Sequence, residues 1–159
     1  MKSPETLLME RRAGWYLNYV RNSREDCINR RLTYEIVECD YATQTLTLRF
    51  ETNDWMMNPG GVVHGGMLCT MFDITMGITS LALSGTFTPT VNLSLSFLSP
   101  APNKDHLLIT ARATRVGKTF VQLTAEGFSE KTRTLCATAT AIFYCAGQEK
   151  LIFDDEAHS

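Results

Sequence analysis

The segment NPGGVVHGGMLCTMFDITMGITSLALSG, residues 58–85, decides the fold of this chain. A glycine-rich turn with Asn58 and His64 leads into a run of apolar residues that has no clearly polar stripe. A helix with that pattern is buried on nearly all sides, so the run predicts a central core helix over residues 65–84. Asp73 is the single charge in this helix, and a carboxylate there is costly to desolvate unless it is paired or used in chemistry.

Alternating apolar and polar residues surround this helix on both sides and predict strands. Before the helix, two such runs flank a turn at residues 40–43, which is typical of a hairpin. After it come four more runs, of which the second and third are separated only by Gly117-Lys118: residues 90–97, 106–116, 119–128 and 134–144. An amphipathic N-terminal helix is expected within residues 1–30, and residues 147–159 are expected to form a flexible acidic tail.

These parts predict one α+β domain spanning residues 1–159. A curved antiparallel sheet wrapped around the central helix would bury that helix economically, with the N-terminal helix as an addition. Such a sheet leaves edge strands, which a homodimer could cover by continuing the sheet. We therefore expect an oligomer.

Composition limits the classes of function. The net charge is -2 and the pI is about 5.9, which does not favour nucleic-acid or anionic-membrane partners. The five cysteines include no CxxC pair, and the N-terminus has no apolar signal segment, so we expect a cytoplasmic protein. No His or Cys cluster has metal-ligand spacing, so we expect no metal. The helix is long enough to span a membrane, but Asp73 and the flanking strands argue against that.

The order of motifs resembles a known family. An NPGGVVHGG loop, followed by an apolar helix with an Asp eight positions after the first Gly of HGG, is similar to the hotdog-fold acyl-CoA thioesterases of the PaaI-like group. The resemblance extends from residue 32 to residue 144 and includes the SPA turn at 99–101 and the RVGKT hairpin at 115–119. It implies a hotdog fold, hydrolysis of an acyl- or aryl-CoA to the free acid and CoA, and no cofactor, since CoA is part of the substrate. It also implies a homodimer, arranged as a dimer of dimers (a homotetramer).

The chemistry of thioester hydrolysis fits these residues independently of the resemblance. The unsatisfied N–H groups at a helix N-terminus can polarise a carbonyl, and Gly65 has no side chain to keep a ligand away from that N–H. Asp73 could act as base or as nucleophile, with desolvation raising its pKa toward a useful range. Eight helical residues separate the two by about 12 Å. One chain therefore cannot bring both to one carbonyl, and we expect a site shared between two antiparallel helices of a dimer.

The resemblance assigns further roles. It implies that Asn58 positions the water or the carbonyl, that His64 shapes the loop or forms a hydrogen bond near the carbonyl, and that Thr90 orients the attacking water. Four more residues are expected to contact the substrate, with the three cations facing the phosphates of CoA: Gly66, Lys104, Arg115 and Lys118.

Each of these residues also has a purely structural explanation. Asp73 could bond a neighbouring hydroxyl, His64 could stabilise its loop, and Asn58 before Pro-Gly fits simple turn chemistry. Thr90 could be an ordinary strand residue, and the cations could be solvated surface charges. Two other functions stay open, a hydratase or dehydratase of the same fold and a non-catalytic acyl-CoA sensor. The sequence does not give the acyl group, whose pocket we expect to depend on the packing of five apolar side chains: Met57, Phe72, Met76, Leu81 and Phe87.

Overall fold

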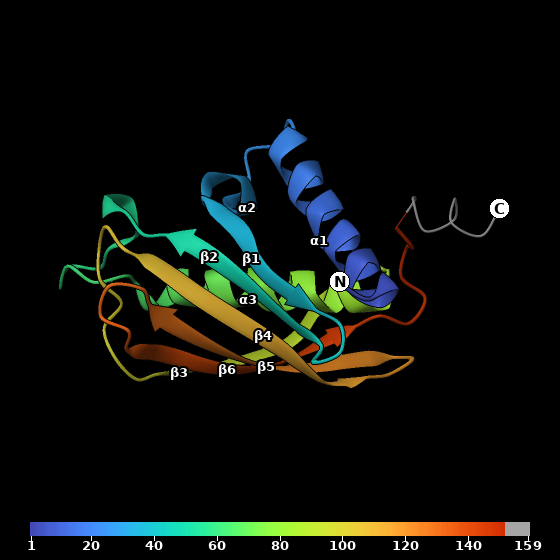
Figure 1. Cartoon of the computed structure of the whole chain (residues 1–159). Coiled ribbons are helices and arrows are strands. Elements are labelled where there is room, and N and C mark those ends of the chain that lie inside the picture. The colour runs from blue at the N-terminus through green and yellow to red at the C-terminus, as the bar shows by residue number, and fades with distance from the viewer. Residues whose placement is uncertain (152–159) are drawn as a thin grey trace.

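A curved six-stranded antiparallel sheet wraps one side of a long helix (Figure 1). The structure is a computed structural model that describes residues 1–151. The strand order across the sheet is β1-β2-β4-β5-β6-β3, and the bounds are β1 Tyr34–Asp40, β2 Thr45–Glu51, β3 Thr90–Phe97, β4 His106–Val116, β5 Phe120–Ser129 and β6 Leu135–Tyr144. A short 3-10 helix, η1 (Asp54–Met56), leads toward the long helix. The predicted α+β architecture is confirmed.

The long helix α3 spans Gly65–Ser84, as the sequence predicts. It ends because Gly85 adopts a left-handed conformation with a φ of 73°, which favours glycine. Met71, Phe72 and Met76 are 0% exposed, because the strands and the N-terminal helix pack around them. Its composition would also suit a membrane span, but 61% of the relevant window is buried inside the protein.

The helix α1 (Pro4–Asn22) packs against α3 and against the edge strand β1 (Figure 1). The Ser3 hydroxyl caps it by accepting a hydrogen bond from the Thr6 N–H at 3.2 Å. The Arg12 guanidinium donates to the Ala82 carbonyl of α3 at 3.1 Å. The predicted N-terminal helix is therefore present, although it ends at Asn22, where the backbone becomes extended, and a separate short helix α2 (Ile28–Arg31) follows.

The edge strand β3 departs from its predicted pattern. Alternation over residues 90–97 predicts that Val91, Leu93, Leu95 and Phe97 face one way, but only Leu93 and Leu95 are half-buried. Val91 and Phe97 are each 57% exposed. An irregularity in the β3–β6 register lies between Thr90 and Asn92, and an irregularity of this kind changes the direction of the side chains beside it. An edge strand that carries exposed apolar side chains is open to pairing with another chain.

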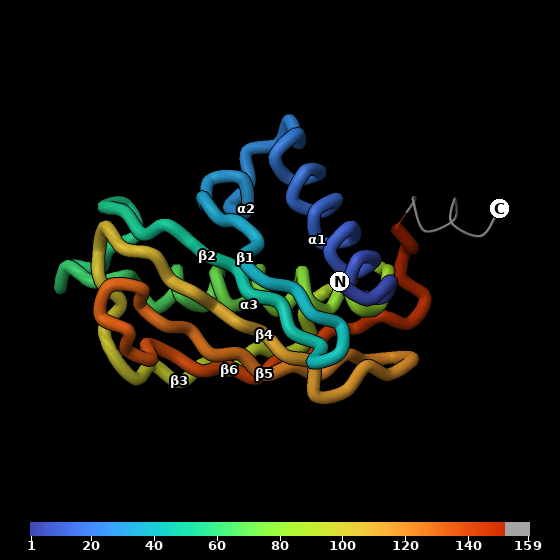
Figure 2. Tube along the Cα trace, viewed as in Figure 1, coloured from blue at the N-terminus to red at the C-terminus, as the bar shows by residue number. Residues whose placement is uncertain are grey.

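The chain after β6 turns back along the end of α3 (Figure 2). The Leu151 N–H donates to the Gly85 carbonyl at 3.0 Å, and the Phe87 N–H donates to the Glu149 carbonyl at 3.0 Å. The Leu151 side chain is 0% exposed. The first part of the segment predicted as a flexible tail is thus bonded to residues 85–87, while residues 152–159 lie outside the described part of the chain.

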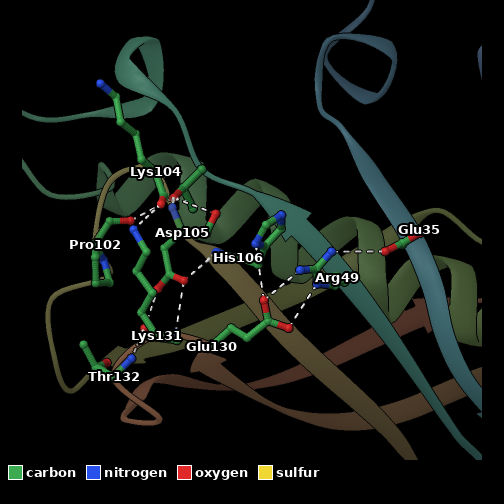
Figure 3. A network of polar contacts seen from close by, with 11 residues as sticks. Glu35, Arg49, Pro102, Lys104, Asp105, His106, Glu130, Lys131 and Thr132 are labelled. Carbon is green, nitrogen blue, oxygen red and sulfur yellow. Dashed lines mark hydrogen bonds and ion pairs between the residues drawn. The ribbon is translucent and has the colours of Figure 1, made fainter.

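A buried carboxylate joins the start of β4 to the β5–β6 turn (Figure 3). Asp105 is 3% exposed, and its carboxylate accepts hydrogen bonds from the Ser129 hydroxyl, the His106 N–H and the Lys131 N–H. Its own N–H donates to the Thr52 hydroxyl at 2.9 Å. Because these partners compensate the desolvation of the carboxylate, this end of the sheet is held by polar contacts beneath its surface.

The packing of α3 on the sheet gives a testable prediction at Gly127. A Cβ on this residue would lie 2.8 Å from Cζ of the fully buried Phe72, so Gly127→Ala forces the ring or the strand to move. Overpacking of this kind lowers the free energy of unfolding by about 1–3 kcal/mol, which urea denaturation would measure. Adding Phe72→Leu should recover part of that loss, whereas additive effects of the two substitutions would contradict the contact.

Candidate functional site

Asp73 and Thr90 meet although α3 and β3 bring them from different elements. The Thr90 hydroxyl donates a hydrogen bond to Asp73 Oδ1 at 2.7 Å. Asp73 lies in the middle of α3 and is half-buried, and Thr90 is the first residue of β3. Among residues 1–151 the second carboxylate oxygen, Oδ2, has no hydrogen-bond partner. The pair therefore holds one carboxylate oxygen and leaves the other for a ligand or a water.

This pair lines a cavity of about 560 Å³. The cavity runs along α3 from Cys69 to Leu81 and is bounded by α1, α2, β3 and β6. Most of its wall near the C-terminal half of α3 is apolar: Ile74, Ile78, Leu81, Phe87, Leu93 and Phe143. A mainly apolar cavity with a few polar groups at one place is the usual form of a small-molecule site.

Two polar residues in the cavity wall were missed by the sequence analysis. Tyr16 comes from α1 and Asn29 from α2, and the Asn29 amide donates to the Tyr16 hydroxyl at 3.4 Å. Burial, with smaller contributions from neighbours that include Asp73, raises the pKa of Tyr16 above its ordinary value. The phenol therefore stays neutral at physiological pH. Nothing in the amphipathic pattern of α1 distinguishes Tyr16 from a packing residue.

At the N-terminal end of α3, one backbone donor is left unpaired. His64 is the N-cap, and its Nδ1 accepts a hydrogen bond from the Gly66 N–H at 2.9 Å. The Gly66 N–H is therefore committed to the cap, while the Gly65 N–H has no acceptor among residues 1–151. A Cβ on Gly65 would lie 3.3 Å from the Phe97 ring, so even a methyl side chain would be a tight fit at this position. The free N–H at the positive end of the helix dipole suits a partly negative oxygen.

Asn58 shapes the loop that precedes this helix. Its side-chain oxygen accepts a hydrogen bond from the Gly60 N–H at 2.8 Å, and its carbonyl accepts one from the Gly61 N–H at 3.0 Å. These are turn contacts, as the structural explanation of Asn58 requires. The nitrogen of its side-chain amide, Nδ2, has no acceptor within residues 1–151. Asn58 and Gly65 share a small cavity of about 310 Å³, beside Phe97.

The two halves of the candidate site are separate in one chain. Asp73 and Thr90 line the large cavity, whereas Asn58 and Gly65 line the small one. The eight-residue spacing along α3 corresponds to about 12 Å between Gly65 and Asp73. The structure therefore keeps the predicted carbonyl-binding group and the predicted acid–base group apart within the protomer.

The three predicted cations do not form one cluster. Arg115 and Lys118 lie in the β4–β5 hairpin and share a cavity with Phe120. Strands β5, β6 and β3 are neighbours, so this hairpin is at the same end of the sheet as Thr90. Lys104 precedes β4, at its other end, which is on the order of 30 Å away along the strand. Its side chain is 73% exposed and points away from the Asp105 contacts (Figure 3).

Residues 1–151 contain no group of three His, Cys, Asp or Glu side chains arranged to hold a metal ion. What the arrangement offers is a paired carboxylate beside an apolar cavity and an unpaired helix N-terminus on the same helix. These are the groups that acyl transfer to water requires.

Comparisons with known proteins agree with this chemistry. Residues 60–136 match the model of the thioesterase superfamily. The acyl-coenzyme A thioesterase THEM4 of Mus musculus is 33% identical over 92 residues, which cover 57% of this chain and 38% of that protein. The chain therefore spans about two fifths of the length of the curated relatives it matches.

Solved structures agree in fold. A putative thioesterase from Ralstonia eutropha, a phenylacetic acid degradation-related protein, is 30% identical with a TM-score of 0.71 and covers 82% of this chain and 99% of that chain. The Escherichia coli PaaI protein from the phenylacetic acid degradation operon is 17% identical with a TM-score of 0.78 and covers 90% and 96% of the two chains. The predicted hotdog fold and the predicted likeness to the PaaI group are confirmed.

The cap at His64 allows its structural role to be measured. His64→Ala removes the acceptor of the Gly66 N–H and should lower the free energy of unfolding by about 0.5–2 kcal/mol. His64→Asn supplies another side-chain acceptor at the N-cap and should recover most of this loss. Urea denaturation of the two variants would measure the difference. Equal stability of the Ala and Asn variants would show that the cap contributes little.

Proposed function

We propose that this chain, which belongs to the thioesterase superfamily, hydrolyses the thioester bond of acyl-CoA to release the free acid and CoA. The observation that carries the proposal is the hydrogen bond from Thr90 to Asp73 in the wall of a cavity that continues into apolar side chains of α3. The acyl-coenzyme A thioesterase name of the mouse relative supports the same substrate class.

In this proposal Asp73 activates the nucleophile. As a base it takes a proton from water while the water oxygen bonds to the thioester carbon. As a nucleophile it attacks that carbon itself and forms an anhydride, which water then hydrolyses. The Thr90 hydroxyl holds Oδ1, so the free Oδ2 faces the reaction in either route. In the base route the tetrahedral intermediate collapses by breaking the C–S bond, and the CoA sulfur receives the proton that Asp73 took from water. In the nucleophile route the C–S bond breaks as the anhydride forms, and the CoA thiolate takes up the proton that water releases when it hydrolyses the anhydride.

The carbonyl oxygen needs a donor that Asp73 cannot supply. The Gly65 N–H has no acceptor in the described part of the chain, and the helix dipole favours negative charge there. Because about 12 Å separates the two groups, we infer that Gly65 of one chain works with Asp73 of a second copy. Antiparallel packing of two α3 helices around a two-fold axis would bring these groups together at two equivalent sites.

The exposed edge of β3 supports this dimer. Val91 and Phe97 of β3, and Leu98 directly after it, are 57%, 57% and 54% exposed, which places large apolar side chains at the edge of the sheet, where β3 pairs only with β6 among the described residues. Phe97 also lies against Gly65, so a partner that covers β3 would come close to the proposed carbonyl site. Pairing of two β3 strands would join the sheets and set the helices antiparallel. A further pairing of dimers into a tetramer belongs to the same proposal.

The cations fit a shared site better than a site in one chain. Arg115 and Lys118 are at the Thr90 end of the sheet, and Lys104 is at the Gly65 end. In the two-fold arrangement, the Gly65 end of one chain approaches the Asp73 end of the other. The three cations would then come from two chains toward the phosphates of one CoA.

The role of Asp73 is tested by a substitution that keeps its shape. Asp73→Asn can still accept a hydrogen bond from Thr90 but cannot take a proton, so turnover of an acyl-CoA should fall by about 10²-fold or more. Binding of the substrate should persist, as measured by calorimetry. Asp26→Asn, at an exposed ion pair with Arg31, serves as control and should keep full activity. An Asp73→Asn enzyme within a few-fold of wild type would remove Asp73 from the mechanism.

The shared site is tested by mixing two inactive variants, Gly65→Pro and Asp73→Asn. Proline suits the first helical position, and the His64 backbone, at φ -59° and ψ 138°, already has a conformation allowed before proline. Each variant alone should be nearly inactive, because Gly65→Pro deletes the N–H donor. Random pairing makes about half of the dimers mixed, and each mixed dimer has one intact site, so about a quarter of all sites should work.

The mixture must first be shown to contain folded mixed dimers. Circular dichroism of Gly65→Pro checks folding, and native mass spectrometry with one mass-labelled chain checks pairing. Mixed dimers as inactive as their parents would rule out a site that combines Gly65 and Asp73 from different chains.

A further inference from the structure

Gly77 occupies an unexpected place for a glycine. It lies in the interior of α3 and contributes to the wall of the large cavity. It follows Asp73 by four residues, which places it on the same face of the helix, one turn further along. Glycine is the least favourable residue in a helix interior apart from proline, so this position forgoes stability that alanine would provide.

Neither the backbone nor the packing of the protein requires glycine at this position. The glycines with a positive φ are Gly61, Gly85 and Gly147, and Gly77 is not one of them. A Cβ on Gly77 would lie 3.4 Å from Cε1 and 3.8 Å from Cζ of Phe143, which is ordinary van der Waals contact. Gly127 is different, since a Cβ there would be 2.8 Å from a buried ring. A methyl group at Gly77 would therefore be accepted by the protein and would occupy cavity space.

That space lies where an acyl group would enter the cavity. Side chains four residues apart on a helix are separated by about 5–6 Å, so the surface at Gly77 follows directly after the Asp73 carboxylate. Ile74 precedes Gly77 by three residues, Ile78 follows it directly, and both line the same cavity. Phe143 faces Gly77 from β6. With a thioester carbonyl at Asp73, the first carbons of the acyl group would lie over the bare helix backbone of Gly77.

We propose that Gly77 is a specificity-determining residue that widens the acyl cavity next to the reacting carbonyl. The site would then accept acyl groups that carry a ring or a branch close to the thioester, which a methyl group at residue 77 would exclude. A narrow unbranched chain could pass the same methyl group. This inference rests on the proposed thioesterase activity, because it concerns the acyl group of that reaction.

Two CoA thioesters with eight acyl carbons test the width of the cavity. Cyclohexylacetyl-CoA carries its bulk beside the carbonyl, and octanoyl-CoA is narrow throughout. In Gly77→Ala the ratio of kcat/KM for cyclohexylacetyl-CoA to that for octanoyl-CoA should fall by about 10-fold or more, because one added methyl group in an apolar pocket discriminates on that scale. The same variant should melt about 2–4 °C higher than wild type, since alanine favours the helix.

Gly14→Ala is the matched control. Gly14 lies inside helix α1, and a Cβ there would meet nothing within 4 Å. This variant should gain a similar rise in Tm while its ratio of kcat/KM values stays within about twofold of wild type. A fall in the ratio of kcat/KM values that is seen only in Gly77→Ala therefore cannot come from the stabilisation of a helix by alanine alone.

Three outcomes would overturn the inference. A folded Gly77→Ala enzyme with an unchanged ratio would show that residue 77 does not set the width. Wild-type hydrolysis of octanoyl-CoA without any turnover of cyclohexylacetyl-CoA would show that the cavity is narrow, and the proposed thioesterase activity would still stand. A wild-type protein that hydrolyses no CoA thioester, acetyl-CoA included, would overturn the proposed function and this inference with it.

Discussion

The burial of α3 is the constraint on which the rest of the structure depends. Its apolar surface needs two covers, the concave side of the sheet and the helix α1, and side chains such as Phe72 and Met76 lose all their exposure between them. Each fully buried side chain of this size contributes about 1.5–3 kcal/mol, so the position of the helix is strongly fixed. Because Asp73 and Gly65 belong to that helix, the same packing fixes the two groups proposed to act on the thioester. The fold therefore supplies a rigid base for a site at its surface.

Sequence patterns predicted most of the fold, because each pattern reflects a local rule. The bounds of α3 follow from the His64 cap and from Gly85, and the strands follow from alternation that the sheet pairing respects. The expectation that α3 is buried on nearly all sides was only partly correct. Thr70, Asp73 and Gly77 form a half-exposed stripe at helical spacing. Glycine and threonine are only weakly polar in hydropathy terms, so this stripe is hard to see in the sequence.

The candidate site could be predicted only where its residues share a local motif. Gly65 and Asp73 are both in the loop-and-helix segment, and Thr90 was assigned to the same site, but its hydrogen bond to Asp73 was not predicted. Tyr16 and Asn29 reach the cavity only because α1 and α2 fold over α3, which no local pattern reports. Of the five side chains expected to shape the acyl pocket, Leu81 and Phe87 line the cavity, and Phe72 and Met76 are buried in the core. Met57 is half-buried where its backbone pairs with Val63, and it does not line the cavity. The cations were expected together, but β4 separates Lys104 from the others, because turns that are similar in sequence can lie at opposite ends of one strand.

The hydrogen bonds between residues 149–151 and residues 85–87 affect the order in which parts of the protein fold during synthesis. Residues 85–89 connect α3 to Thr90, and this connection is held by a segment that leaves the ribosome after all six strands. Contacts so distant in the sequence form only after a large loss of chain entropy, so they tend to form late. The core around α3 can assemble earlier, because its strands are already available. The geometry of the Asp73–Thr90 pair is then among the last features to be completed, and a nascent chain would hold its core before it holds its reactive centre.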